Sequence, residues 1–259
     1  MTVPADKFQR VQITARNDYS PDLWSIRVRT EDKPGFKPGQ YATLGVERGA
    51  KVVQKAYSIV SSPLEDEMEF FFELVPNGEL TPLLYELGVG DSMWMRRQTR
   101  GLFILDQVSG HAKHGLLCTV TGVAPYVSMA RTLARTEPKG NNCQIVIIQA
   151  ASRSWEFAYR EELEALSQKA GWLRYIPCVS RPWENAAWSG EVGRVEDVAR
   201  KYLDELGLNS SDTTAYLCGH PQMIENCKGI FRRKGFPKES VREEIYWIPA
   251  KPLKAQVMA

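Results

Sequence analysis

The sequence is poor in the residues that metal sites and disulfide frameworks require. It has 3 histidines and 5 cysteines in 259 residues, and the cysteines form no C-x-x-C pair or longer ladder. Such a set offers no ligand arrangement for an iron–sulfur cluster or a structural zinc ion, so we expect no metal site. The cysteines are odd in number and lie mostly in apolar runs, which favours a reducing compartment and hence a cytoplasmic protein.

An excess of charge of one sign is also absent. Lys and Arg together number 33, and Asp and Glu number 31, so the chain has no strong overall field of the kind that attracts nucleic acid. Residues 1–12 lack the apolar core of a signal peptide, and no run is long and apolar enough to span a membrane. We therefore expect neither nucleic acid nor a membrane as a partner.

The first part of the chain has the pattern of a β-barrel. Short runs rich in β-branched and aromatic residues alternate with turns such as Pro76-Asn77-Gly78, and six strands in this arrangement favour a small closed antiparallel barrel. One helix is expected here, because Thr81 is a good N-cap residue and Pro82 suits the first helical position. The expected strands cover residues 8–14, 23–28, 41–46, 53–60, 69–75 and 92–95.

The rest of the chain alternates apolar strands with helical patterns. This alternation predicts a parallel sheet covered by helices on both faces, with ligands bound beyond the carboxyl ends of the strands. We therefore expect two domains, over residues 1–106 and 107–259. The expected strands cover 116–120, 144–149, 173–179, 214–218 and 241–247, and the helical patterns begin near 125, 157, 195 and 223.

Several short motifs occur in a fixed order along nearly the whole chain. They are Gly39-Gln40-Tyr41, Tyr57-Ser58, Gly78 to Pro82, Gly90-Asp91, Thr121 to Pro125, Val179-Ser180-Arg181, Gly193-Arg194 and Leu217 to Met223. In this order they resemble the ferredoxin–NADP reductase family, and most closely its bacterial ferredoxin/flavodoxin–NADP reductases. The resemblance implies an FAD-binding barrel, an NADP-binding α/β domain, hydride transfer from NADPH to FAD, and delivery of single electrons to ferredoxin or flavodoxin.

Tyr57 and Ser58 lie at the end of an expected strand, where two neighbouring side chains can reach one ligand. Taken alone, the segment favours an ordinary amphipathic strand over a ligand site. The resemblance implies that Tyr57 stacks on the isoalloxazine ring and that the Ser58 hydroxyl lies within reach of flavin N5, where a donor stabilises developing charge. Lys55 stands where the family has an arginine that grips the pyrophosphate, so the charge is kept but the bidentate fork is lost.

The resemblance also implies a second phosphate-binding element. Backbone N–H groups at the start of the expected helix, together with the Thr81 hydroxyl, would form an anion site, although a merely capped turn is the alternative. The remaining implied flavin contacts are Ala56, Phe72, Glu73, Leu74, Val75, Gly78, Leu80 and Thr81.

Thr121 and Gly122 stand in the strand-to-helix turn where the family carries a glycine-rich pyrophosphate loop. Val120 replaces a usual glycine, and a β-branched residue disfavours positive φ and close approach of a phosphate. The resemblance adds Gly219, in the turn after another strand, to the implied dinucleotide contacts.

The residues after the second and third strands of the sheet favour NADP over NAD. No acidic residue follows the second strand before Glu156, and arginine suits a 2′-phosphate. The family's arginine after this strand aligns with Ser152, so Arg153 is a substitute shifted by one position. Arg181 and Arg194 match arginines of the family, and Ser180 precedes the first of them. Surface decoration is the alternative for each arginine.

Cys218 and Glu244 complete the predicted catalytic set with Ser58. A buried cysteine usually only packs, but the resemblance implies that Cys218 borders the nicotinamide C4 position, and that Glu244 lies at the flavin edge as a proton or salt-bridge partner. Trp247 is the expected cover for the flavin face opposite Tyr57, with Tyr246 as the alternative.

Other functions share much of this pattern. One is a reductase that supplies electrons to an oxygenase through its iron–sulfur component. Another is a non-catalytic flavin-binding module, an alternative that stays because Val120 and Lys55 depart from the family pattern. A barrel and sheet without any cofactor is a third. For the reductase we expect a monomer that docks acidic carriers near the flavin edge, with Arg96, Arg97 and Arg100 as candidate contacts.

Overall fold

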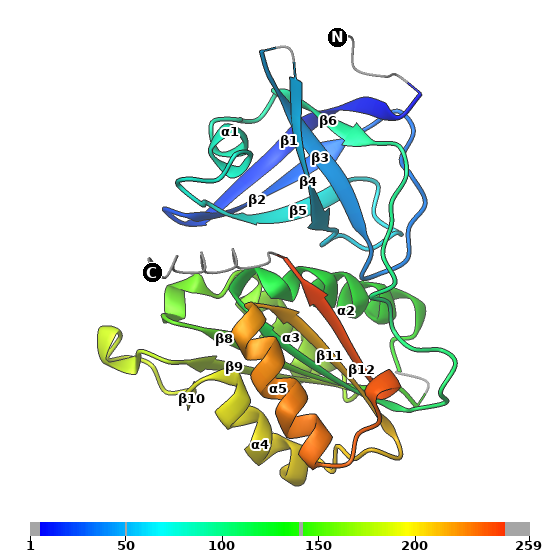
Figure 1. The fold of residues 1–259 in the computed structure, drawn as a ribbon, viewed down its shortest axis with the longest axis vertical. Helices are drawn as coiled ribbons and strands as arrows, with labels where there is room; N and C mark the ends of the chain where they lie inside the picture. The colour runs from blue at the N-terminus through cyan, green and yellow to red at the C-terminus, as the bar shows by residue number, and fades with distance from the viewer. Residues whose placement is uncertain (1–5, 50, 140–141, 247–259) are drawn as a thin grey trace, which may run out of the picture.

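The computed structural model describes residues 6–49, 51–139 and 142–246, and it contains two six-stranded sheets, one in each part of the chain (Figure 1). The first sheet is antiparallel, with strand order β4-β3-β6-β1-β2-β5. Its strands are β1 Phe8–Ser20, β2 Leu23–Arg29, β3 Tyr41–Arg48, β4 Lys51–Ser58, β5 Met68–Glu73 and β6 Ser92–Arg96.

The two edge strands of this sheet meet and close it into the predicted barrel. Ile59, just after β4, forms an antiparallel bridge with Phe70 of β5, and the Val60 N–H donates to the Glu69 carbonyl oxygen at 2.8 Å. These contacts close the sheet at the end of β4, whereas residues 51–58 of β4 itself pair with β3. The barrel interior is apolar, and its Trp24 and Phe72 rings stack at 5.2 Å.

The short helix α1, Thr81–Tyr85, differs in detail from the expectation. Its N-cap is Leu80, without a side-chain capping bond, so Thr81 is the first helical residue and not the cap. The reason is a competing hydrogen bond: the Thr81 Oγ1 atom accepts from the Val75 N–H at 3.0 Å. This bond ties the helix to the end of β5.

The second sheet is parallel and has the order β10-β9-β8-β7-β11-β12. The alternation of strands and helices predicted it, except for β10, whose two residues are too short to leave a periodic signal. Its strands are β7 Lys113–Thr119, β8 Gln144–Ala151, β9 Leu173–Val179, β10 Glu191–Val192, β11 Thr213–Gly219 and β12 Val241–Ile245. Its helices are α2 Ala124–Thr136, α3 Arg160–Lys169, α4 Val195–Glu205 and α5 Pro221–Arg233.

Helices cover both faces of this sheet, as apolar parallel strands require. Residues of α4 and α5 share one core cluster, whereas residues of α2 and α3 share the other, which continues into the barrel through Phe71 and Phe103. Figure 1 shows α2 on the side of the sheet that faces the barrel. The helix therefore sets the position of the barrel relative to the sheet.

A buried ionic network fastens this contact. Glu69 of β5 is only 2% exposed, and its carboxylate accepts hydrogen bonds from Arg27 at 2.9 Å, from Arg131 of α2 at 2.7 Å and from the Tyr159 hydroxyl at 2.8 Å. A buried carboxylate needs several donors of this kind to offset its loss of hydration. None of the helices in the described ranges has the length and hydrophobicity that a bilayer crossing needs.

Candidate functional site at the junction of barrel and sheet

The three residues of the predicted catalytic set come together where the barrel meets the sheet. Ser58 is the last residue of β4, and its hydroxyl donates to Glu244 Oε2 at 2.9 Å across 186 positions of sequence. Glu244 lies on β12 in register with Cys218 at the end of β11. One side chain from the barrel and two from the sheet therefore form a single cluster.

Tyr246 joins this cluster. Its hydroxyl donates to Ser58 Oγ at 3.1 Å and is also hydrogen-bonded to the Cys218 thiol. Trp247, the preferred candidate for the cover of a flavin ring, lies outside the described residues. Tyr246, the alternative candidate, is thus directly beside Ser58.

Burial decides the protonation states in the cluster. It raises the pKa of the Cys218 thiol well above its usual value, which keeps the group neutral and argues against a nucleophilic thiolate. Burial also raises the pKa of the Glu244 carboxyl to about 7, although the hydrogen bond from Ser58 acts to lower it. Glu244 can therefore hold or release a proton near neutral pH.

This shift predicts a pH dependence of stability. The folded pKa of Glu244 is raised, so its contribution to stability is fully present below pH about 4.5 and is lost as the pH rises through about 7. The free energy of unfolding should fall by on the order of 2 kcal/mol over that window relative to Glu244→Gln, which cannot titrate. Urea unfolding of both proteins from pH 4 to pH 8 measures the difference, and a constant difference would contradict the prediction.

Tyr57 offers an aromatic face and an unused polar atom. Its ring packs edge-on against Phe72 of β5, with ring centroids 4.8 Å apart, while its buried hydroxyl has no hydrogen-bond partner among the described residues. Burial without a partner raises the pKa of this phenol and costs free energy. A polar, planar ligand at this position would supply the missing partner, so the residues present fit a flavin.

The other predicted flavin contacts also lie in the barrel part of the chain. Lys55 and Ala56 are exposed on β4, and Lys55 has no ion-pair partner within the described part of the chain, so its ammonium group is available to an anion. The remaining contacts follow one another from β5 into α1, namely Phe72, Glu73, Leu74, Val75, Gly78, Leu80 and Thr81.

The turn after β7 is tighter than the expected glycine-rich loop. Residues Val120–Val123, with the predicted contacts Thr121 and Gly122, form a 3₁₀ helix that leads directly into α2. Val120 takes the positive φ of 39° that a β-branched residue disfavours. In this conformation the Val120 side chain packs against the apolar cluster of Ala151, Phe157 and Val179.

Gly122 and Gly219 pack the ends of β7 and β11 against each other. A Cβ atom on Gly122 would lie 2.4 Å from the Cys218 carbonyl oxygen, and one on Gly219 would lie 2.3 Å from Thr119 Oγ1. The same Thr119 oxygen accepts from the His220 N–H at 2.9 Å. Neither glycine can carry a side chain without moving Cys218 or Thr119.

The predicted arginines lie at the other half of the same sheet edge. Arg153 follows β8 and Arg181 follows β9, and the two loops are joined by a hydrogen bond from the Arg181 N–H to the Ser152 carbonyl oxygen at 3.0 Å. The Ser180 N–H donates to the Ala151 carbonyl oxygen at 3.0 Å. Arg194 is exposed just before α4.

Glu156 is a residue whose place the sequence spacing did not reveal. It lies beyond the end of β8, yet its carboxylate folds back and accepts from the Ser152 N–H at 2.8 Å and from Arg153 Nη1 at 3.1 Å. An acidic group is therefore present in the loop after the second strand of the sheet. Its pairing with Arg153 makes the loop close to neutral.

The strand order places the predicted dinucleotide contacts in a line along one edge of the sheet. From β9 through β8 and β7 to β11, the sheet edge presents Arg181, Arg153, Gly122 and Cys218 in that sequence. Three strand spacings of about 4.8 Å separate the ends of this line. An extended ligand could therefore place an anionic end at the arginines and a flat ring at Cys218.

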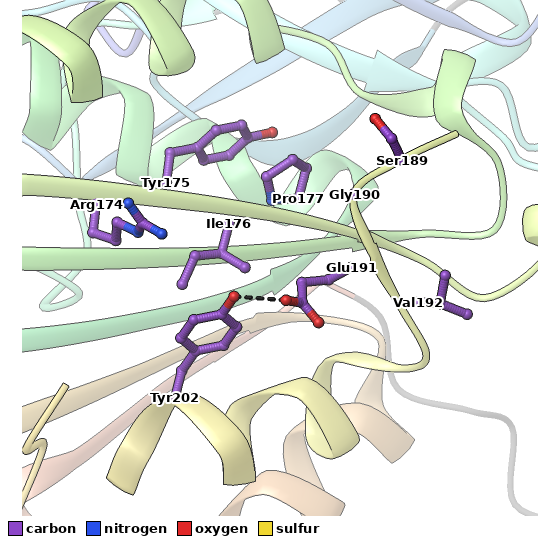
Figure 2. A pocket seen from close by; sticks show the side chains of 9 residues that line it. All are labelled: Arg174, Tyr175, Ile176, Pro177, Ser189, Gly190, Glu191, Val192 and Tyr202. Atoms are coloured by element: carbon purple, nitrogen blue, oxygen red, sulfur yellow. Dashed lines mark hydrogen bonds between the residues drawn. The ribbon is translucent and has the colours of Figure 1, made fainter. Parts of the chain in front are cut away.

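Two surface cavities lie at different distances from this line of residues. The cavity in Figure 2, of about 310 Å³, lies along β9 and β10 and is lined by residues such as Tyr175, Pro177 and Glu191, whose carboxylate accepts from the Tyr202 hydroxyl at 2.7 Å. None of the predicted site residues lines it. A cavity of about 600 Å³ instead lies between Tyr41 of the barrel and Glu244, and so adjoins the junction cluster.

Comparison with known proteins identifies the relatives of the chain. Residues 116–229 match the model of the oxidoreductase NAD-binding domain. The flavodoxin/ferredoxin–NADP reductase of Escherichia coli strain K12 is 30% identical over 217 residues, which cover 83% of this chain and 86% of that protein. The ferredoxin–NADP reductase of Pseudomonas aeruginosa is 30% identical over 236 residues, which cover 85% of this chain and 87% of that protein.

Solved structures share the fold. A ferredoxin NADP⁺ reductase from Neisseria gonorrhoeae with bound FAD and NADP has a TM-score of 0.83 at 23% identity and covers 93% of this chain and 99% of its own. The ferredoxin reductase in carbazole 1,9a-dioxygenase has a TM-score of 0.76 at 21% identity. The match covers 93% of this chain and 69% of that protein. Identity at that level indicates the fold alone, whereas the relatives at 30% identity over most of the chain establish the family. The chain belongs to the flavodoxin/ferredoxin–NADP reductase family.

Proposed function

We propose that this chain is an FAD-dependent reductase that takes hydride from NADPH and delivers single electrons to ferredoxin or flavodoxin. The observation that carries the proposal is the cluster of Ser58, Cys218 and Glu244, which unites the barrel with the carboxyl edge of the sheet. No amino-acid side chain accepts a hydride and releases it as two single electrons. Bound FAD would supply acceptance of a hydride and its release as single electrons.

Residues of the barrel would hold the flavin. Tyr57 would stack on the isoalloxazine ring, and either Tyr246, whose hydroxyl donates to Ser58, or Trp247 would cover the second face. Lys55 and the backbone between Gly78 and Thr81 would take the phosphates. Ala56, Phe72, Glu73, Leu74, Val75 and Leu80 would complete the walls.

Residues of the sheet would orient the dinucleotide. Cys218 and Gly219 would border the nicotinamide. Thr121 and Gly122 would contact the pyrophosphate. The residues at the adenosine end would be Ser180, Arg153, Arg181 and Arg194. The Ser58 hydroxyl, which donates to Glu244 in this structure, would turn to donate toward the atom that receives hydride, and Glu244, with its pKa of about 7, would hold or release a proton beside it. Transfer then depends on proximity and alignment.

We further propose that residues 1–106 form the FAD-binding domain and residues 107–259 the NADP-binding domain. A monomer is the proposed functional state, because one chain supplies all three members of the cluster. A cytoplasmic location is also proposed, and the five free cysteines support it.

The carrier would dock beside the cavity at Tyr41. Arg100 lies there, because its N–H donates to the Tyr41 carbonyl oxygen at 2.9 Å and Tyr41 is in register with Ser58. Of the other candidates, Arg96 contacts Gln54, which pairs with Gly45 four residues along β3 from Tyr41, and Arg97 contacts Asp32 in the loop after β2. Arg100 is thus the favoured contact for an acidic carrier.

This placement predicts the effect of reversing one charge. Arg100→Glu should lower kcat/KM for an acidic carrier about fivefold at low ionic strength, with the deficit shrinking as salt is added. Reduction of ferricyanide, which needs no docking, should be unchanged. Arg232→Glu, on the exposed end of α5, is the matched control. Equal losses for both variants would contradict a docking role for Arg100.

The proposal is tested by electron delivery. Protein loaded with FAD is given NADPH and, in separate assays, a ferredoxin, a flavodoxin or the iron–sulfur component of an oxygenase, and carrier reduction is followed by absorbance. Reduction of ferredoxin or flavodoxin at the higher rate supports the proposed function. Preference for the oxygenase component would replace the carrier assignment, and no reduction of any carrier would favour a flavin-binding module.

A further inference from the structure

The two arginines that follow β8 and β9 share one carboxylate. Arg153 donates from Nε to Glu184 Oε2 at 2.5 Å, and Arg181 donates from Nη1 to Glu184 Oε1 at 3.5 Å. Glu184 ends the 3₁₀ helix Pro182–Glu184, which follows Arg181 directly. The carboxylate thus bridges both arginines at the carboxyl edge of the sheet.

Arg153 is held from a second side as well. Glu156 accepts from its Nη1 atom at 3.1 Å and from its backbone N–H at 3.3 Å. The hydrogen bond from Arg153 lowers the pKa of the Glu184 carboxyl, so that group stays ionised at neutral pH. Two carboxylates therefore engage Nε and Nη1 of Arg153 and Nη1 of Arg181, which are donors that the sequence assigned to a phosphate.

Arg194 provides the contrast. It is exposed at the N-cap of α4, and no ion pair to it is found within the described ranges 6–49, 51–139 and 142–246. Its charge is available to a ligand without the loss of an internal pair. The predicted 2′-phosphate site thus combines one available arginine with two arginines that are already neutralised.

We propose that Glu184 is a specificity-determining residue that competes with the 2′-phosphate of NADP(H) for Arg153 and Arg181. The inference rests on the proposed function, in which this sheet edge binds NADP(H). A 2′-phosphate must displace the carboxylate from both arginines, and the displaced Glu184 then lies close to a group of like charge. A dinucleotide with a free 2′-hydroxyl breaks neither ion pair, so Glu184 narrows the preference for NADP(H) over NAD(H).

Binding of small probes to the purified protein tests this competition directly. Isothermal titration calorimetry compares adenosine 2′,5′-bisphosphate, which carries the 2′-phosphate, with 5′-AMP, which lacks it. Glu184→Gln should tighten binding of the bisphosphate about fivefold at low salt and leave 5′-AMP unchanged. The gain should shrink at high salt, because the competing ion pairs are partly exposed.

Glu67→Gln is the matched control. It removes one carboxylate that pairs with an arginine, Arg29, at 2.7 Å, but on the barrel. Two results would overturn the role of Glu184 in favour of a general charge effect. One is an equal increase in bisphosphate affinity in Glu67→Gln, and the other is an equal increase in 5′-AMP affinity in Glu184→Gln. Unchanged bisphosphate affinity in Glu184→Gln would overturn it too, while leaving NADP binding intact. If neither protein bound the bisphosphate, the proposed NADP site itself would fail.

Discussion

Replacing Ser58 with alanine should slow the reduction of bound flavin by NADPH about 100-fold, the size of effect seen when one donor to a developing charge is removed. Ser58 is 5% exposed, and its hydroxyl is the atom that links Glu244 to Tyr246. Its loss also removes the hydrogen bond that lowers the Glu244 pKa, so the carboxyl becomes still easier to protonate. Rapid-mixing absorbance measurements of flavin bleaching give the rate directly.

Ser25→Ala is the control for this substitution. Ser25 is also buried in the barrel, and its hydroxyl bonds to the Tyr19 hydroxyl at 3.2 Å and to the Tyr159 hydroxyl, not to Glu244 or Tyr246. This variant should reduce flavin at the unaltered rate even if it is somewhat less stable. A Ser58→Ala protein that binds FAD and is reduced as fast as the unaltered protein would contradict the assigned role.

The second large effect is expected from Gly122→Ala. The added methyl group would lie 2.4 Å from the carbonyl oxygen and 2.8 Å from the carbonyl carbon of Cys218. Backbone atoms of a buried central strand cannot yield as a flexible side chain does, so β11 must shift. We expect a loss of about 2 to 3 kcal/mol in the free energy of unfolding, measured by urea denaturation, together with weaker NADP(H) binding because Cys218 moves.

Gly171→Ala separates this steric effect from the general cost of changing a glycine. A Cβ atom on Gly171 would meet nothing within 4 Å, and the residue has no positive φ. Its replacement should leave both stability and dinucleotide binding nearly unchanged. A Gly122→Ala protein as stable as Gly171→Ala would show that the end of β11 is less tightly packed than the structure indicates.

Much of the fold could be predicted from the sequence, because local patterns define it. Turn signals between β-branched runs located the barrel strands, and the apolar stripe of α4 located that helix. The sequence could not reveal β10, because two residues leave no periodic signal. Nor could it reveal that the Thr81 hydroxyl bonds back to Val75 and so gives up the N-cap position.

The site required more than local pattern. Ser58 and Glu244 are separated by 186 positions, and nothing in their spacing indicates contact; only the resemblance to a family joined them. The hydroxyl of Tyr246 between Ser58 and Cys218 was visible only in three dimensions. Glu156 and Glu184 were missed for a related reason, because a carboxylate that folds back onto an arginine leaves no periodic trace in the sequence.

The central claim is that the junction of barrel and sheet binds a flavin and passes hydride to it from NADPH. The most direct test is the visible spectrum of the purified protein without oxygen, before and after one equivalent of NADPH. We predict a yellow protein whose flavin band is bleached by NADPH. A colourless protein that takes up no FAD, or a yellow one whose band NADPH leaves intact, would contradict the account.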